Sequence, residues 1–169
     1  TIVAYHRQHG GLLSMEDLAE FRVGIESPVC TRFAGMQVYA CGPWCQGPVL
    51  LQMLNILDGV DLRGLGHNSP AYLHHLLEAM KLAFADRERF YGDPRFVDVP
   101  MAALLSADYA ALRRSLCRSG EAWPGLPPPG DPLAGRATAS AEGTIQPAAR
   151  DAGPGLDTSY TCAVDVAGN

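Results

Sequence analysis

The dipeptide Asp157-Thr158 contains the residue with the clearest capacity for chemistry in this chain. Its threonine opens a β-rich stretch that runs to Asn169, and it follows a long segment rich in Pro, Gly, Ala and Ser. If the peptide bond before Thr158 were cut, the new α-amine would titrate near neutrality and could act as general base for the adjacent hydroxyl. The pattern indicates an amino-terminal nucleophile released by cleavage, with Asp157 and Thr158 as the processing site.

Two cysteines and three histidines are the residues that could hold a metal ion. Cys41 and Cys45 precede His67, His74 and His75. Their spacing matches no common zinc-ligand pattern, and there is no second cysteine pair. We therefore predict no metal site and no cofactor, and we expect structural roles for the two adjacent histidines.

Composition and charge limit the class of protein and its partners. The chain has 169 residues, 47% of them apolar, enough for one globular domain or most of one. Its 13 Lys and Arg against 18 Asp and Glu give a net charge of −5. No basic run is long enough to indicate nucleic acid as a partner. The apolar runs end well before the roughly twenty residues that a spanning helix needs, so we expect no membrane segment.

The cysteines indicate the cellular compartment, and the chain ends indicate whether the sequence is a whole protein. Five cysteines at unpatterned spacings favour reduced thiols, and therefore the cytoplasm over the periplasm. The first residue is Thr1 rather than Met, and the turn signal at 165–169 promises a strand that does not follow. We expect a fragment of a longer protein.

Several short elements are predicted ahead of the processing site. Gly10-Gly11 ends a first helix, and Ser14 caps a second over 15–21. Two strands, 22–32 and 36–41, form a hairpin through Ala34-Gly35. A helix begins at Pro48 and ends at Asp58-Gly59, and another, capped by Ser106, covers 107–117.

The longest predicted helix begins at Ser69-Pro70, ends near Tyr91 and is broken by Gly92-Asp93-Pro94. Its apolar stripe consists of Leu73, Leu76, Leu77, Met80 and Phe84. Its charged residues, expected on the opposite side as a solvated or interface ion-pair network, are Glu78, Lys81, Asp86 and Arg87.

Three segments follow from this pattern. Residues 1–118 form a helical region with a hairpin, and residues 158–169 form one strand. Between them, 119–157 has too few large apolar residues to offset its ordering entropy, which predicts a flexible linker.

Four stretches of the chain together resemble the γ-glutamyltranspeptidase family of amino-terminal-nucleophile hydrolases. They occur in the family's order, with the expected variable segment before the threonine. The stretches are Gly10 to Leu18, Gly42 to Leu57, Glu78 to Arg87 with Gly92-Asp93-Pro94, and Asp157 to Asn169.

The resemblance implies an α+β fold, part of a four-layered αββα sandwich that a large and a small subunit build together. This chain would hold the C-terminal part of the large subunit and the first strand of the small one. The family implies self-cleavage before Thr158, and transfer of a γ-glutamyl group from glutathione-like amides to water, an amino acid or a peptide. The partners would be these small molecules and the rest of both subunits.

The chain also departs from the family pattern. Thr158-Ser159-Tyr160 replaces the usual Thr-Thr-His, so Ser159 keeps a hydroxyl as possible support for the site, while Tyr160 leaves substrate preference open. The family's carboxylate-binding arginine would lie upstream of Thr1, and its oxyanion-hole glycines downstream of Asn169. We therefore expect an inactive fragment with the 157–158 bond intact.

Uncovered apolar faces predict oligomers of the fragment. The alternative is a non-catalytic structural or interaction domain from a divergent homologue.

Overall fold

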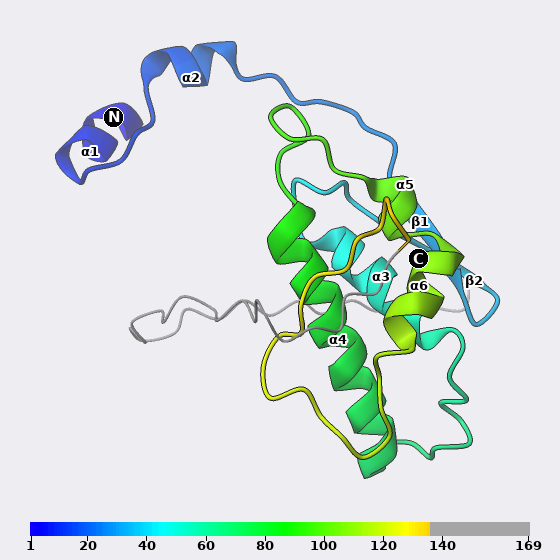
Figure 1. The fold of residues 1–169 in the computed structure, drawn as a ribbon. Helices are drawn as coiled ribbons and strands as arrows, with labels where there is room; N and C mark the ends of the chain where they lie inside the picture. Colours follow the sequence, from blue (N-terminus) through cyan, green and yellow to red (C-terminus); the bar gives the residue numbers. More distant parts are fainter. Residues whose placement is uncertain (136–169) are drawn as a thin grey trace, which may run out of the picture.

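The computed structural model of the chain describes residues 1–135. Helices dominate this part, and the α+β class is confirmed because one small antiparallel sheet accompanies them (Figure 1). The elements are α1 (Ile2–Gln8), α2 (Met15–Glu20), β1 (Val29–Phe33), β2 (Met36–Ala40), α3 (Gly47–Leu57), α4 (Pro70–Phe90), α5 (Met101–Leu104) and α6 (Ala107–Arg114).

Side-chain caps begin three of the helices at the expected residues. Ser14 and Asp17 form a reciprocal capping box, with the Asp17 N–H 3.1 Å from Ser14 Oγ. Ser69 and Ser106 likewise accept hydrogen bonds from the third residue of α4 and of α6. The single turn α5, after Pro100, was not predicted.

The hairpin forms where expected but is shorter than predicted. β1 pairs with β2 from Val29 opposite Ala40 to Phe33 opposite Met36, so residues 22–28 lie outside the sheet. Ala34 and Gly35 both have positive φ, 49° and 82°, as in the type I′ turns whose twist matches that of paired strands.

Replacing Gly35 with alanine should lower the free energy of unfolding by about 1 kcal/mol, because a Cβ is strained at this φ. Urea denaturation of the chain measures this. Gly24→Ala is the matched control, since a Cβ meets nothing within 4 Å at either position but Gly24 is not among the glycines with positive φ. Equal stabilities of the two variants would contradict the turn geometry.

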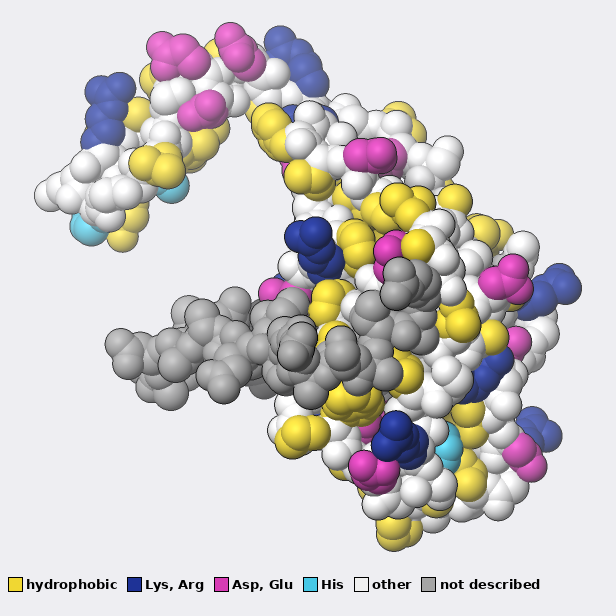
Figure 2. Space-filling view, in the orientation of Figure 1, with side chains coloured by type: hydrophobic (Ala, Val, Ile, Leu, Met, Phe, Trp, Pro, Cys, Tyr) yellow, Lys and Arg dark blue, Asp and Glu magenta, His cyan; other side chains and the backbone are white. Residues whose placement is uncertain are grey.

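Helix α3 lies at the centre of the folded body. It packs against α4, α6 and both strands, and the main apolar cluster joins its Ile56 and Leu57 to Ala79 and Leu82 of α4. Helices α1 and α2 lie apart from this body, linked to it by residues 21–28 (Figure 1). Along this arm and over the body, hydrophobic side chains reach the surface (Figure 2). Oligomerisation of the isolated chain stays a prediction.

The buried face of α4 differs from the predicted one. Leu73, Leu77 and Met80 of the expected apolar stripe are 42%, 52% and 37% exposed. The residues buried instead are Glu78, Ala79, Leu82, Ala83, Ala85 and Asp86. The alanines present little bulk toward the packed neighbours, and the two carboxylates find partners elsewhere in the chain. Of the two predicted alternatives, a solvated network is therefore wrong for Glu78 and Asp86, whereas Glu78 and Lys81 do form an ion pair at a contact with another segment.

The described part of the predicted linker is packed on the body rather than free. Pro127, Pro128, Gly130 and Pro132 are buried. We call residues 121–132 the strap. The strap is held by hydrogen bonds that a count of apolar residues does not register, and the flexibility of the linker as a whole stays a prediction. Residues 136–157 and the predicted strand 158–169 lie outside the described residues, and the three-segment division stays a prediction.

No helix within residues 1–135 is long and apolar enough to cross a membrane.

Candidate functional site

The predicted catalytic and processing residues lie outside the described part of the chain. This applies to Asp157, Thr158 and Ser159 alike. What the structure does show is how the strap, which precedes them in the sequence, is attached to α4 and α6. Two charged pairs make this attachment, and both use side chains that reach backbone atoms of the strap.

The first pair, which we call the Gly130 clamp, consists of Asp86 on α4 and Arg113 on α6. Their side chains are fully buried, with Arg113 Nη2 3.2 Å from Asp86 Oδ1. Asp86 Oδ1 also accepts a 2.8 Å hydrogen bond from the Gly130 N–H, and Arg113 Nη2 donates to the Pro128 carbonyl at 3.1 Å. The pair therefore holds one donor and one acceptor of the strap.

Neighbouring polar groups complete the surroundings of Asp86. Gln52 on α3 donates to Asp86 Oδ2 at 3.2 Å and accepts from the Tyr91 hydroxyl at 2.6 Å. Arg113 Nη2 also donates to the Leu82 carbonyl, whereas its Nε and Nη1 are buried without a hydrogen-bond partner. The cluster is thus well satisfied on its acidic side and incompletely satisfied on its basic side.

Burial controls the ionisation of this cluster. It raises the pKa of Asp86 above 3.8, although the Arg113 charge and the Gly130 N–H act in the opposite direction. Burial, followed by the nearby Asp86 charge, raises the pKa values of Tyr91 and Tyr109 as well. Both phenols therefore stay protonated at neutral pH.

The second pair, which we call the Trp123 clamp, consists of Glu78 and Lys81, one turn apart on α4. Lys81 Nζ lies 2.7 Å from Glu78 Oε1 and donates to the Trp123 carbonyl at 2.6 Å. Glu78 Oε2 accepts from the Trp123 N–H at 3.1 Å. Both backbone groups of Trp123 are satisfied by one ion pair, as a neighbouring β-strand would satisfy them.

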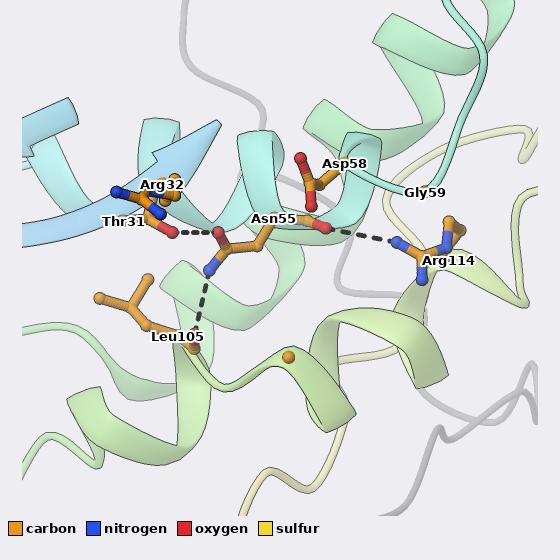
Figure 3. Close-up of a pocket in the computed structure, with 8 residues that line it drawn as sticks. Thr31, Arg32, Asn55, Asp58, Gly59, Leu105 and Arg114 are labelled. Carbon is orange, nitrogen blue, oxygen red and sulfur yellow. Dashed lines mark hydrogen bonds between the residues drawn. The ribbon is translucent and has the colours of Figure 1, made fainter. Parts of the chain in front are cut away.

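A separate polar cavity of about 260 Å³ lies between the hairpin, α3 and α6 (Figure 3). Thr31 donates to Asn55, and Asn55 Nδ2 donates to the Leu105 carbonyl at 3.0 Å. Arg114 Nη1 donates to the Ile56 carbonyl at 3.1 Å, near the end of α3. These polar groups are already used to join the elements, so the cavity has a structural explanation.

The histidines and cysteines considered as metal ligands do not come together in the described part of the chain. His74 hydrogen-bonds to the Arg118 carbonyl at 2.7 Å, and His75 to the Ala71 carbonyl at 2.9 Å. Cys45 contacts the Gly42 carbonyl. Among residues 1–135 no group of three or more His, Cys, Asp or Glu is placed to hold a metal ion.

Comparison with known proteins identifies the family. A family model described as Gamma-glutamyltranspeptidase matches residues 1–169. The chain belongs to the γ-glutamyltranspeptidase family. The predicted family is confirmed, and the match extends across both the strap and the predicted processing site.

Two curated relatives of this chain bear different activity names. The "Acylase ACY 1 proenzyme" of Pseudomonas sp. (strain SE83) is 40% identical over 70% of this chain and 21% of its own length. The "Glutathione hydrolase proenzyme" of Escherichia coli (strain K12) is 38% identical over 62% of this chain and 18% of its own length. The chain thus spans about a fifth of these relatives.

Solved structures agree with the family. Helicobacter pylori gamma-glutamyltranspeptidase matches 72% of this chain and 35% of its own, with 31% identity and a TM-score of 0.67. Cephalosporin acylase from Bacillus halodurans matches 78% of this chain and 24% of its own, with 35% identity and a TM-score of 0.65. These likenesses confirm the predicted fold class, part of an amino-terminal-nucleophile hydrolase.

The two clamps were not predicted from the sequence. The charge pattern of α4 predicts a solvated or interface ion-pair network for Glu78 and Asp86, but it does not indicate Arg113 as the partner of Asp86. A usable signal was present, because Glu78 and Asp86 share the face of α4 that carries Ala79 and Ala83. A carboxylate on a face of small residues indicates burial against a specific partner.

Proposed function

We propose that this chain is part of a self-cleaving proenzyme and spans its processing site at Asp157-Thr158. The observation that carries the proposal is the family match, which continues through residue 169 and so includes both residues. Relatives that bear the word proenzyme in their names support it. The remaining parts of the large and small subunits are the partners that the site requires.

The chemistry follows from the residue types. Before cleavage, the Thr158 hydroxyl attacks the carbonyl carbon of Asp157, the peptide C–N bond breaks, and the chain is joined through an ester that water then hydrolyses. The freed α-amine of Thr158 next takes the proton of its own hydroxyl as that oxygen attacks a substrate amide. The leaving amine departs with a proton, and the acyl ester passes to water or to an acceptor amine. Ser159 supplies a second hydroxyl beside this nucleophile.

The first candidate substrates are γ-glutamyl amides such as glutathione, as the names of several relatives indicate. A second candidate class is the amides cleaved by cephalosporin acylases. It is favoured by the 40% identity to an acylase proenzyme and by the likeness to a cephalosporin acylase structure.

The experiment is expression of the full-length gene product, followed by intact-mass measurement and two hydrolysis assays. We expect a small subunit that begins with Thr158, and release of the dye from a chromogenic γ-glutamyl anilide. A product that cleaves itself but hydrolyses only a cephalosporin side chain would favour the second class. A protein that neither cleaves nor hydrolyses either amide would support the non-catalytic alternative.

A further inference from the structure

Residues 21–28, which link α2 to β1, form a drawn-out segment without helix, strand or turn (Figure 1). In its first half every second residue is apolar, namely Phe21, Val23 and Ile25. These side chains are 70%, 82% and 101% exposed. A period of two is typical of a β-strand with one buried face, so the segment has the sequence of a strand without the surroundings of one.

The backbone of this segment is unpaired as well. Within the described residues, no group accepts a hydrogen bond from the N–H groups of residues 22–27. Strand β2 does not supply a partner, because its pairing with β1 ends at Val29 opposite Ala40. The preceding residue, Pro28, has no N–H, and the chain after β2 turns at Gly42, whose carbonyl accepts from the Cys45 N–H. The segment therefore presents an open edge, which is a template for another strand.

The C-terminal end of the segment is already held on the body. Glu26 accepts hydrogen bonds from the Trp44 indole N–H at 2.6 Å and from the Gly42 N–H at 3.3 Å. The segment also leads directly into β1, whose odd-numbered residues are partly buried, with Thr31 bonded to Asn55 of α3. The three apolar residues of the segment are odd-numbered too. In a continuous strand they extend the inward face of β1, so the segment is oriented for pairing before a partner arrives.

We propose that residues 21–27 pair, as a β-strand, with a strand from the part of the full-length protein that lies beyond this chain. Main-chain hydrogen bonds to the partner satisfy the open edge, and apolar residues of the same sheet layer cover Phe21, Val23 and Ile25. The chain spans about a fifth of two of its relatives, so most of each molecule is available to supply this strand. A partner in the same polypeptide is present at high effective concentration.

The proposal rests on the proposed function in one respect only, that this chain is part of a longer protein. It does not depend on the chemistry of Thr158. It assigns to residues 21–27 a role as an interface within the molecule, rather than as a connection between α2 and β1.

Hydrogen exchange of the full-length protein, resolved to single amides, tests the pairing. A strand paired along one edge directs alternate N–H groups to its partner. We therefore expect at least every second amide of residues 22–27 to exchange about 100-fold more slowly than in an unstructured peptide. Fast exchange at all six amides would overturn the proposal. Protection that disappears on dilution, together with a dimer in sedimentation, would assign the partner to a second copy and would also overturn it.

A pair of variants tests whether the apolar face is covered. The Ile25 side chain is fully exposed in this structure, so a charge there is harmless unless another segment covers it. In full-length Ile25→Asp we expect the protection of residues 22–27 to fall at least about tenfold. Gly24→Asp is the matched control, because it adds the same side chain on the opposite face, where a Cβ meets nothing within 4 Å, and it should keep the protection.

An equal loss of protection in both variants would contradict the assignment of the faces. If Ile25→Asp does not fold, the exchange pattern of the wild-type protein decides the question by itself. Protected amides in a protein that never cleaves at Thr158 would support the strand pairing while refuting the proposed function. Normal cleavage with all six amides unprotected would do the reverse.

Discussion

Replacing Arg113 with methionine is expected to lower the free energy of unfolding by about 3–5 kcal/mol. The substitution leaves the buried Asp86 carboxylate without its counter-charge and leaves the Pro128 carbonyl without its donor. Methionine fills much of the vacated volume, so the loss comes mainly from the uncompensated charge. Urea denaturation of the folded chain, followed by circular dichroism, measures the change.

The loss in free energy of unfolding caused by Arg113→Met should also depend on pH. The folded-state pKa of Asp86 is already raised, so its contribution to stability is fully present below about 3.8 and is lost as pH rises through the folded value. Without Arg113 this pKa rises further. The Arg113→Met penalty should therefore be smaller at pH 4 than at pH 7, because a neutral Asp86 needs no partner.

Two controls separate this effect from general damage. Arg95→Met breaks the pair with Asp93, which lies at the surface, and should change stability little. In a double-mutant cycle, Asp86→Ala with Arg113→Met should cost less than the sum of the single changes, because the second substitution removes the charge that the first one stranded. Additive costs would show that the two side chains do not interact.

Replacing Thr158 with alanine should abolish self-cleavage of the full-length precursor and lower amide hydrolysis by about 10³-fold or more. Alanine has no oxygen to attack the Asp157 carbonyl, so no ester forms and no amino-terminal nucleophile is released. Intact mass shows the processing state, and the anilide assay measures hydrolysis.

Thr158→Ser is the matched control for this prediction. Serine keeps the hydroxyl and the future α-amine, so the precursor should still cleave and retain measurable activity. If Thr158→Ala cleaves at the wild-type position, the nucleophile has been misassigned. If Thr158→Ser is as inactive as Thr158→Ala, the role of the hydroxyl is in doubt.

Local signals in the sequence predicted most of the described elements. Ser14, Ser69 and Ser106 mark helix starts because a single side chain satisfies free backbone donors, and this interaction needs no distant partner. Ala34-Gly35 marks the turn for a similarly local reason. The buried face of α4 could not be predicted in this way, since the partners of the buried Asp86 come from distant parts of the chain: Gln52, Arg113 and Gly130.

The sequence likewise predicts one part of the candidate site, the processing threonine, but not the attachment of the strap. Thr158 was reached through a resemblance of four separate stretches, and family membership is confirmed, while its own role stays a prediction. Composition predicts a flexible linker for the strap, because a proline-rich sequence offers little apolar area to bury. Its attachment depends instead on hydrogen bonds with the side chains of Glu78, Lys81 and Asp86. Amino-acid composition does not indicate which backbone groups these side chains bind.

The clamps' use of backbone atoms has a consequence for how this region evolves. A segment held by its peptide groups can exchange most side chains without losing its attachment, so selection on the strap falls chiefly on Gly130. The constraint is transferred to the helices, where Glu78, Lys81, Asp86 and Arg113 must be kept together. Homologues should therefore differ widely in sequence between α6 and the processing threonine. The four charged positions on the helices, in contrast, should change only together.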